Sequence, residues 1–301
     1  MRVISDDTVR FTAAVYDEWA GCEQLQFRPP AGSGVPESFG DGGLSGGPVV
    51  WQRPLMRGPC LIAFVMLAWV ARANRVDDLG RIHLEAIGGK ARVSALAAVQ
   101  ATGAVVTGGT RVRFIMTAAR PAKLRIELER AGRTKVQGYD GTDSPWEFDT
   151  GSWPPRYQPM PANSAKAFIA DAEFDDPLVA GAAGGYTFEY GGEVQAGPTP
   201  LLRIMATRRL TETFALLLDP DTYLIVMRIE QRASASGRPV QILTRFEDYR
   251  PVGGVLLAHR ITLLVDGRVS QETVIDRIDG NPEVQAETFS RPRPAAPTSG
   301  S

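Results

Sequence analysis

Cysteine and histidine are scarce in this chain, and their scarcity excludes several kinds of site. The 301 residues contain two cysteines, Cys22 and Cys60, and both precede Asn74. The rest of the chain can therefore form neither a disulfide framework nor a thiolate metal site. The two histidines, His83 and His259, lack the spacing of a metal-binding pair. We expect His83 on a helix surface and His259 on a strand face, with neither of them catalytic.

An excess of charge of either sign is also missing. Lys plus Arg number 33 and Asp plus Glu number 34, so no strong field favours a nucleic acid as partner. The acidic clusters "EFDD" (173–176) and "FEDY" (246–249) lack the loop spacing of a calcium-binding hand. The sequence therefore predicts a protein that is not an enzyme and that needs no metal and no cofactor.

The most apolar segment near the start of the chain is too short to span a membrane. Leu61 to Val70 is a run of ten apolar residues, whereas a spanning helix needs about 20. Arg57 precedes this run and Ala71-Arg72-Ala73 follows it, as in a signal peptide. We predict a signal peptide at 56–73, cleavage near Ala73, and export to the periplasm as a product without a lipid anchor.

Two alternatives remain for this segment. One is a buried core helix, which Pro59 disfavours. The other is an uncleaved anchor, which Arg72 and Arg75 disfavour because positive charge prefers the cytoplasmic side of a membrane.

The two ends of the chain have compositions that disfavour a packed core. Residues 1–55 include the Gly- and Pro-rich stretch "AGSGVPESFGDGGLSGGPVV", and we interpret them as a disordered extension. A wrongly assigned start of translation would explain this extension, and Met56 would then be the true first residue. Residues 293–301 are expected to be a disordered tail. Between the signal peptide and this tail, residues 74–292 are predicted to form one domain.

Polar and apolar residues alternate through most of that domain. In "KLRIELER", Leu124, Ile126 and Leu128 alternate with charged residues, and in "RVRFIMT" the alternating positions are Val112 and Phe114, followed by Met116. This period of two is typical of strands with one buried and one wet face. Further strands follow the same pattern at 186–190, 201–209, 212–219, 223–232, 239–249, 255–265 and 269–279.

Helical patterns are few by comparison. Two short ones precede the strands, at 79–87 and 90–99, and a third interrupts them within 163–179. An open sheet this large must curl to bury its apolar face, and so few helices can only close its mouth. We therefore predict a mainly β (α+β) fold: a curved antiparallel sheet of about ten or eleven strands, forming a half-open barrel lidded by short helices around a hydrophobic cavity.

The cavity wall is assigned to the inward-facing positions of the strands. The predicted wall residues are Val112, Phe114, Met116, Leu124, Ile126, Leu128, Trp146 and Phe148, and the predicted lid residues are Phe168 and Phe174. For any single one of these side chains, an ordinary filled core is the favoured alternative. The arginines of "LLRIMATRR" (201–209) are expected on the outer face, where they keep the protein soluble or bind a partner.

Several stretches share a resemblance to a known family. They are "AIGGKARVSALAAVQATGAV" (86–105), "RPAKLRIEL" (120–128), "YDGTDSPWEFD" (139–149), "AEFDDPLV" (172–179), "FEDYRPVGGVLLAHRI" (246–261) and "ETFSRP" (287–292). Together they resemble the LolA/LolB-type outer-membrane lipoprotein-sorting family of cell-envelope carriers. The resemblance extends from about Asp78 to Pro292.

The resemblance implies a periplasmic, monomeric carrier without catalytic chemistry. Its partners would be the acyl chains of a lipoprotein or another envelope lipid, with an inner-membrane donor and an outer-membrane acceptor. It also implies an arginine that holds the lid closed, although nothing in the sequence selects it among the arginines of this chain. Two alternatives stay open: a periplasmic sensor that binds lipid and a signalling partner, and a structural envelope protein with a filled core.

Overall fold

One continuous antiparallel sheet dominates the protein. The structure, a computed structural model, describes residues 75–152, 154–196, 199–209, 212–233 and 238–291. The predictions for the extension at 1–55, the signal peptide at 56–73 and the tail at 293–301 lie outside these residues.

The sheet contains thirteen strands, whereas ten or eleven were expected. The strands of the first half are β1 (Ala98–Thr107), β2 (Thr110–Ala119), β3 (Lys123–Arg130), β4 (Arg133–Tyr139), β5 (Trp146–Asp149) and β6 (Tyr157–Pro159). Those of the second half are β7 (Tyr186–Gln195), β8 (Pro200–Arg208), β9 (Glu212–Leu218), β10 (Ile225–Ala233), β11 (Pro239–Val252), β12 (Val255–Val265) and β13 (Arg268–Gly280).

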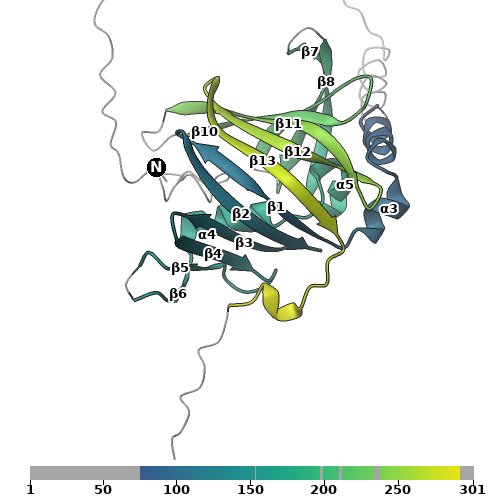
Figure 1. The fold of residues 1–301 in the computed structure, drawn as a ribbon. Helices are drawn as coiled ribbons and strands as arrows, with labels where there is room; N and C mark the ends of the chain where they lie inside the picture. The colour runs from purple at the N-terminus through teal and green to yellow at the C-terminus, as the bar shows by residue number, and fades with distance from the viewer. Residues whose placement is uncertain (1–74, 153, 197–198, 210–211, 234–237, 292–301) are drawn as a thin grey trace, which may run out of the picture.

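The two halves of the chain join in the middle of the sheet. The strand order is β6-β5-β4-β3-β2-β1-β13-β12-β11-β10-β9-β8-β7, so β13 pairs with β1 and each half is a meander. The edges, β6 and β7, do not pair with each other. The sheet is therefore open, as the half-open barrel of the prediction requires, and Figure 1 shows its strong curvature.

Part of the curvature arises where β1 meets β13. The register between these strands shifts between Thr102 and Gly103. A Cβ at Gly103 would clash with the carbonyl oxygen of Val274, so only glycine allows the strands to approach this closely.

Short helices lie at one end and on one face of the sheet. They comprise a helix over residues 75–86, α3 (Lys90–Ala95), α4 (Ala162–Asp171), α5 (Pro177–Ala180) and the 3-10 turns η2 (Gly181–Gly184) and η3 (Ala286–Thr288). Figure 1 shows α3 and α5 at the end of the strands, and α4 behind β2 and β3. Phe168 of α4 is completely buried against Phe114, Ile126 and Leu128, so α4 is anchored to the concave face.

The first helix corrects one expectation from the sequence. His83 is 2% exposed, not on the helix surface as predicted. It lies on the stripe formed by Val76, Leu79 and Ile87, which are also buried, and this stripe faces the sheet. His259 lies in β12 as expected and is likewise buried.

Candidate functional site

A largely apolar cavity of about 360 Å³ lies between the concave face of the sheet and the helices. Its volume falls within the range of small-molecule sites. Apolar side chains from both halves of the sheet line it, among them Met116, Leu124, Leu216, Phe246, Ile261 and Ile275. The helical side contributes Ile87, Leu96, Phe174 and Pro177.

Three of the ten predicted side chains line this cavity. They are Met116, Leu124 and Phe174. Val112, Phe114, Ile126, Leu128 and Phe168 share the same concave face but pack against one another as a filled core, each no more than 3% exposed. For these five residues, the ordinary-core alternative describes the structure.

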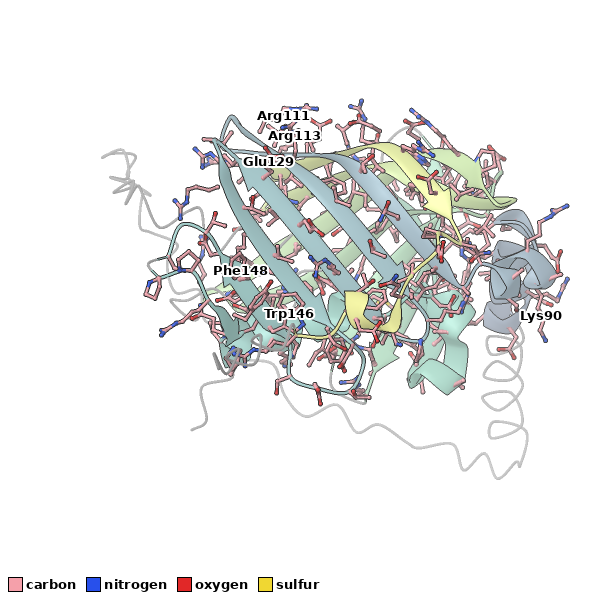
Figure 2. All side chains as sticks on the ribbon, turned by 60° about the horizontal axis from the view of Figure 1, so that its bottom comes forward. Lys90, Arg111, Arg113, Glu129, Trp146 and Phe148 are labelled. Carbon is pink, nitrogen blue, oxygen red and sulfur yellow. The ribbon has the colours of Figure 1, made fainter. Side chains whose placement is uncertain are left out.

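Trp146 and Phe148 lie on the opposite, convex face, so their assignment to the cavity wall is wrong. Leu124 pairs with Tyr139, and Ile126 with Gln137, whereas Trp146 pairs with Gly138. Paired residues share a face, and neighbouring residues alternate, so Trp146 faces away from Leu124. Its indole Nε1 donates a hydrogen bond to the carbonyl of Phe289, 2.9 Å away. Figure 2 shows Trp146 beside the C-terminal segment that it anchors.

The second half of the sheet supplies most of the wall that sequence analysis missed. The alternation in β11 and β12 was recognised, but which face of each strand is inward depends on pairings with β13 and β1 across the whole domain. Phe246 pairs with Ile261, and both line the cavity.

Arg120 joins two segments at the rim of the cavity. Its guanidinium donates hydrogen bonds to the carbonyls of Val93 (2.9 Å) and Leu96 (3.0 Å), at the end of α3. It also forms an ion pair with Asp175 and lies 4.8 Å from the ring centre of Phe174. Arg120 thus ties α3 to the α4–α5 loop, which covers the cavity.

His83 forms a second tie at the same rim. Its Nε2 lies 3.2 Å from an Asp176 carboxylate oxygen, and its Nδ1 lies 2.8 Å from the carbonyl oxygen of Tyr223. Asp176 also caps α5 by accepting from the backbone N–H groups of Leu178 and Val179. His83 therefore connects the first helix to α5 and to the β9–β10 turn.

Both neighbours of the His83 ring are acceptors, so the protonated imidazole satisfies them best. Burial alone would lower the pKa of His83, but the hydrogen bond and negative charge of Asp176, together with the Tyr223 carbonyl, raise it above 6.5. For Asp176, burial acts to raise the pKa, but the bonds from His83 and from the α5 backbone lower it below 3.8.

One region of the cavity wall is charged. Arg228 of β10 is 4% exposed, and its guanidinium lies 3.9 Å from the ring centre of Phe214. One of its nitrogens donates to Glu230 at 3.1 Å, and Arg232 donates to the other oxygen of Glu230 at 2.8 Å. Arg228 and Glu230 line the cavity.

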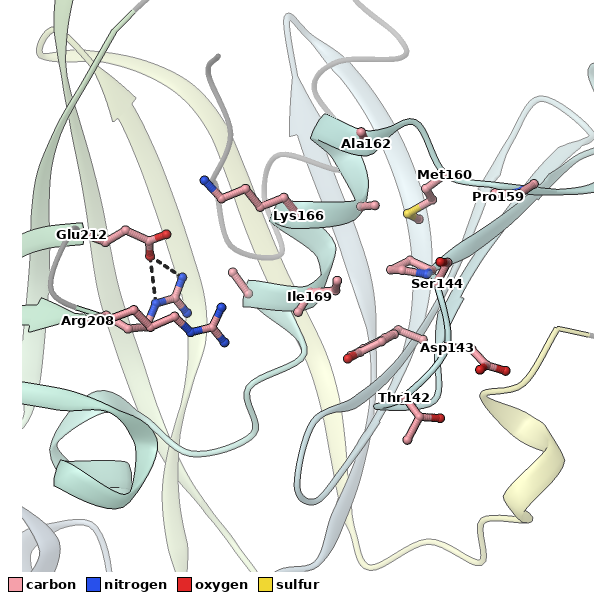
Figure 3. Close-up of a pocket in the computed structure, with 15 residues that line it drawn as sticks. Thr142, Asp143, Ser144, Pro159, Met160, Ala162, Lys166, Ile169, Arg208 and Glu212 are labelled. Carbon is pink, nitrogen blue, oxygen red and sulfur yellow. Dashed lines mark hydrogen bonds and ion pairs between the residues drawn. The ribbon is translucent and has the colours of Figure 1, made fainter. Parts of the chain in front are cut away.

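A second, more polar groove of about 590 Å³ lies on the other side of α4 (Figure 3). Lys166 and Ile169 of α4 face it, as do Ser144 and the ion pair of Arg208 with Glu212. Arg208 is buried and binds both Glu212 (2.5 Å) and Glu173 (2.8 Å), so it does not lie on the outer face as expected.

Two further searches concern only the described residues. Within them, no group of three or more His, Cys, Asp or Glu side chains is arranged to hold a metal ion. In the same part of the chain, no helix has both the length and the apolar character needed to cross a membrane.

No family model and no curated protein sequence matches the chain. Among solved structures, a putative outer membrane lipoprotein-sorting protein domain from Vibrio parahaemolyticus is similar at 11% identity, covering 70% of this chain and 95% of that one, with a TM-score of 0.49. A LolA superfamily protein from Nitrosomonas europaea is similar at 14% identity, covering 73% and 98%, with a TM-score of 0.47.

A DUF1329 family protein from Desulfovibrio piger is also similar, at 12% identity, covering 73% of this chain and 97% of that one, with a TM-score of 0.47. Two of these three structures have names of the kind that the sequence motifs resemble. These likenesses concern the fold alone.

Proposed function

We propose that this chain is a non-catalytic carrier that binds the apolar chain of a lipoprotein or of another envelope lipid in the cavity between the sheet and the helices. The observation that carries the proposal is the cavity itself, which is lined mainly by aliphatic and aromatic side chains and covered by segments tied down at Arg120 and His83. A filled core, as in a structural envelope protein, would leave no such volume.

The mechanism is binding and release by differential affinity. Each methylene transferred from water into the cavity stabilises the complex by about 0.8 kcal/mol. The bound chain favours the closed state, and loss of the ties at the rim favours the open state from which the chain leaves. In the periplasm, the proposed compartment, an inner-membrane donor would load the carrier and an outer-membrane acceptor would unload it.

The direct test is to identify what the protein carries. The full chain is expressed with its own N-terminal region, purified without detergent, and its extract is analysed by mass spectrometry. A lipid or lipoprotein at close to one molecule per protein supports the proposal. The absence of any lipid, together with no binding of a fluorescent apolar probe, would overturn it.

Filling the cavity should weaken binding without disturbing the sheet. Ala118 of β2 lines the cavity, and Ala118→Phe places a ring in the volume that the ligand needs. We expect the affinity for a fluorescent apolar probe to fall at least about tenfold, equivalent to about 1.4 kcal/mol. Ile115→Phe is the matched control, because Ile115 lies on the same strand, faces outward and is 44% exposed. Equal losses in both variants would contradict the assignment of this cavity.

A further inference from the structure

We infer that the end of the sheet remote from the helices is a docking surface for an anionic membrane, with its arginines bound to lipid phosphates. The surface, called the basic rim below, consists of six arginines at or beside the turns of this end: Arg111, Arg130, Arg133, Arg156, Arg238 and Arg268. The inference goes beyond the proposed function, because it concerns where the protein is held and not what it carries.

The topology of the sheet gathers these arginines from distant parts of the sequence. The β1–β2, β3–β4 and β12–β13 hairpins each end in a turn of two residues. These three hairpins are neighbours in the sheet, because β2 pairs with β3 and β1 pairs with β13. Arg156 directly precedes β6 and Arg238 directly precedes β11, at the same end. Figure 2 shows Arg111 at this end, far from Lys90 of α3.

The basic rim carries an excess of positive charge. Two aspartates lie within it, and each pairs with one of the six arginines: Asp149 with Arg133, and Asp266 with Arg238. In the described part of the chain, Arg111 and Arg268 are exposed and form no ion pair. Arginine suits lipid phosphates in particular, because its planar guanidinium can donate two parallel hydrogen bonds to one phosphate.

The opposite end of the sheet does not share this excess. Its turns carry four aspartates, two between β4 and β5 and two between β9 and β10: Asp140, Asp143, Asp219 and Asp221. The nearly equal totals of acidic and basic residues in the whole chain therefore conceal a separation of charge between the two ends. A separation of this kind favours one orientation of the protein on an anionic surface.

Val269 favours a membrane over an acidic protein as the occupant. It follows Arg268 beside the β12–β13 turn and is 65% exposed, more than any other large apolar residue in the described ranges. At a membrane surface, an apolar side chain can enter the acyl boundary while neighbouring arginines stay among the phosphates. An anionic bilayer also attracts basic residues without requiring a matched shape, which suits arginines that come from separate hairpins.

Docking at the basic rim leaves the helical end of the protein free. Arg120 and His83 tie down the segments that cover the cavity, and both lie at that end. The cover can therefore open toward a donor or an acceptor while the protein stays on the membrane.

The test measures co-sedimentation of the purified full chain with two kinds of vesicle, one of phosphatidylcholine alone and one of phosphatidylcholine and phosphatidylglycerol in equal parts. At low salt we expect the anionic vesicles to bind the protein at least about tenfold more tightly than the neutral ones. This preference should vanish near 1 M salt, where the Debye length is about 3 Å. Any binding by the N-terminal region is common to all variants.

Removing two rim charges should weaken this binding. Arg111→Gln combined with Arg268→Gln should lower the affinity for anionic vesicles at least about tenfold, because each basic residue at such a surface contributes about fivefold. Both side chains are exposed, so the variant should fold and bind an apolar probe as the wild type does. Val269→Ser should lower the affinity at least about threefold.

Arg250→Gln combined with Arg277→Gln is the matched control. Both arginines are exposed but lie at the helical end, where they pair with Asp248 and Asp279. This variant has the same net charge as the rim variant and should keep the wild-type affinity for vesicles.

Equal binding of the wild type to both kinds of vesicle, or equal losses in the two double variants, would overturn the inference while leaving the carrier function intact. Loss of an acidic protein partner by the rim variant, with vesicle binding unchanged, would assign the rim to that partner and overturn membrane docking. Failure of the wild type to bind any apolar probe would count against the carrier function alone.

Discussion

Arg120→Met is expected to lower the free energy of unfolding by about 1.5–3 kcal/mol and to speed the exchange of any bound apolar probe. The guanidinium makes two hydrogen bonds to the end of α3 and an ion pair with Asp175, and its side chain is 28% exposed. Hydrogen bonds to a charged group contribute about this much, and methionine keeps much of the packing without the donors. Urea denaturation gives the stability, and stopped-flow displacement of a fluorescent probe gives the rate of opening.

The control for Arg120 is Arg113→Met on the convex face. Arg113 pairs with Glu129 at 3.2 Å, but its side chain is 73% exposed, so the change should stay within about 0.5 kcal/mol. If Arg120→Met weakened the fold but left the probe exchange rate at the wild-type value, Arg120 would be a structural residue with no part in covering the cavity.

The sheet could be predicted from the sequence because alternating polar and apolar residues show which face of each strand is buried. In "KLRIELER" every second residue is apolar, and β3 has these residues buried. β5 and β6 escaped because they have four and three residues, too few for a period to be recognised. Trp146 and Phe148 were assigned to the wrong face for a related reason: the loop over residues 140–145 interrupts the alternation, and one residue of register exchanges the two faces.

The sequence predicts that a cavity exists, but it does not identify most of the residues that line it. Inward-facing positions either line a space or fill a core, and the choice depends on where α4 lies. Phe168 fills the region next to Phe114 and Leu128, so the open volume is displaced toward Phe174 and the strands of the second half. That displacement follows from tertiary packing between distant segments, which no local pattern encodes.

His83 is a case in which the signal was present in the sequence. Val76, Leu79, His83 and Ile87 follow the spacing of a buried helical stripe, and the structure buries all four. The prediction placed His83 on the helix surface because it treated histidine as a polar surface residue. A buried histidine implies a partner, and the partner, Asp176, is 93 residues away in the chain.

The pairing of buried His83 with partly exposed Asp176 should make the stability of the fold depend on pH. The pKa of His83 is raised above 6.5 in the folded state, so its contribution is fully present below pH 6.5 and is lost as the pH rises through the folded pKa. Asp176, whose pKa is lowered below 3.8, stays ionised over this range. The free energy of unfolding should therefore decline as the pH rises above about 6.5 and through the folded pKa of His83.

His83→Gln tests how much His83 contributes to this pH dependence. Glutamine can donate to one of the two acceptors but cannot carry a charge, so we expect it to cost about 1–3 kcal/mol near pH 6 and less once the pH exceeds the folded pKa of His83, which flattens the pH profile. His259→Gln serves as the control for replacing a buried histidine, because the ring of His259 lies 2.9 Å from the carbonyl oxygen of Leu257 on its own strand rather than joining distant segments. Parallel wild-type and His83→Gln profiles across this range would show that the pKa of His83 is the same in the folded and unfolded states, and would contradict the prediction.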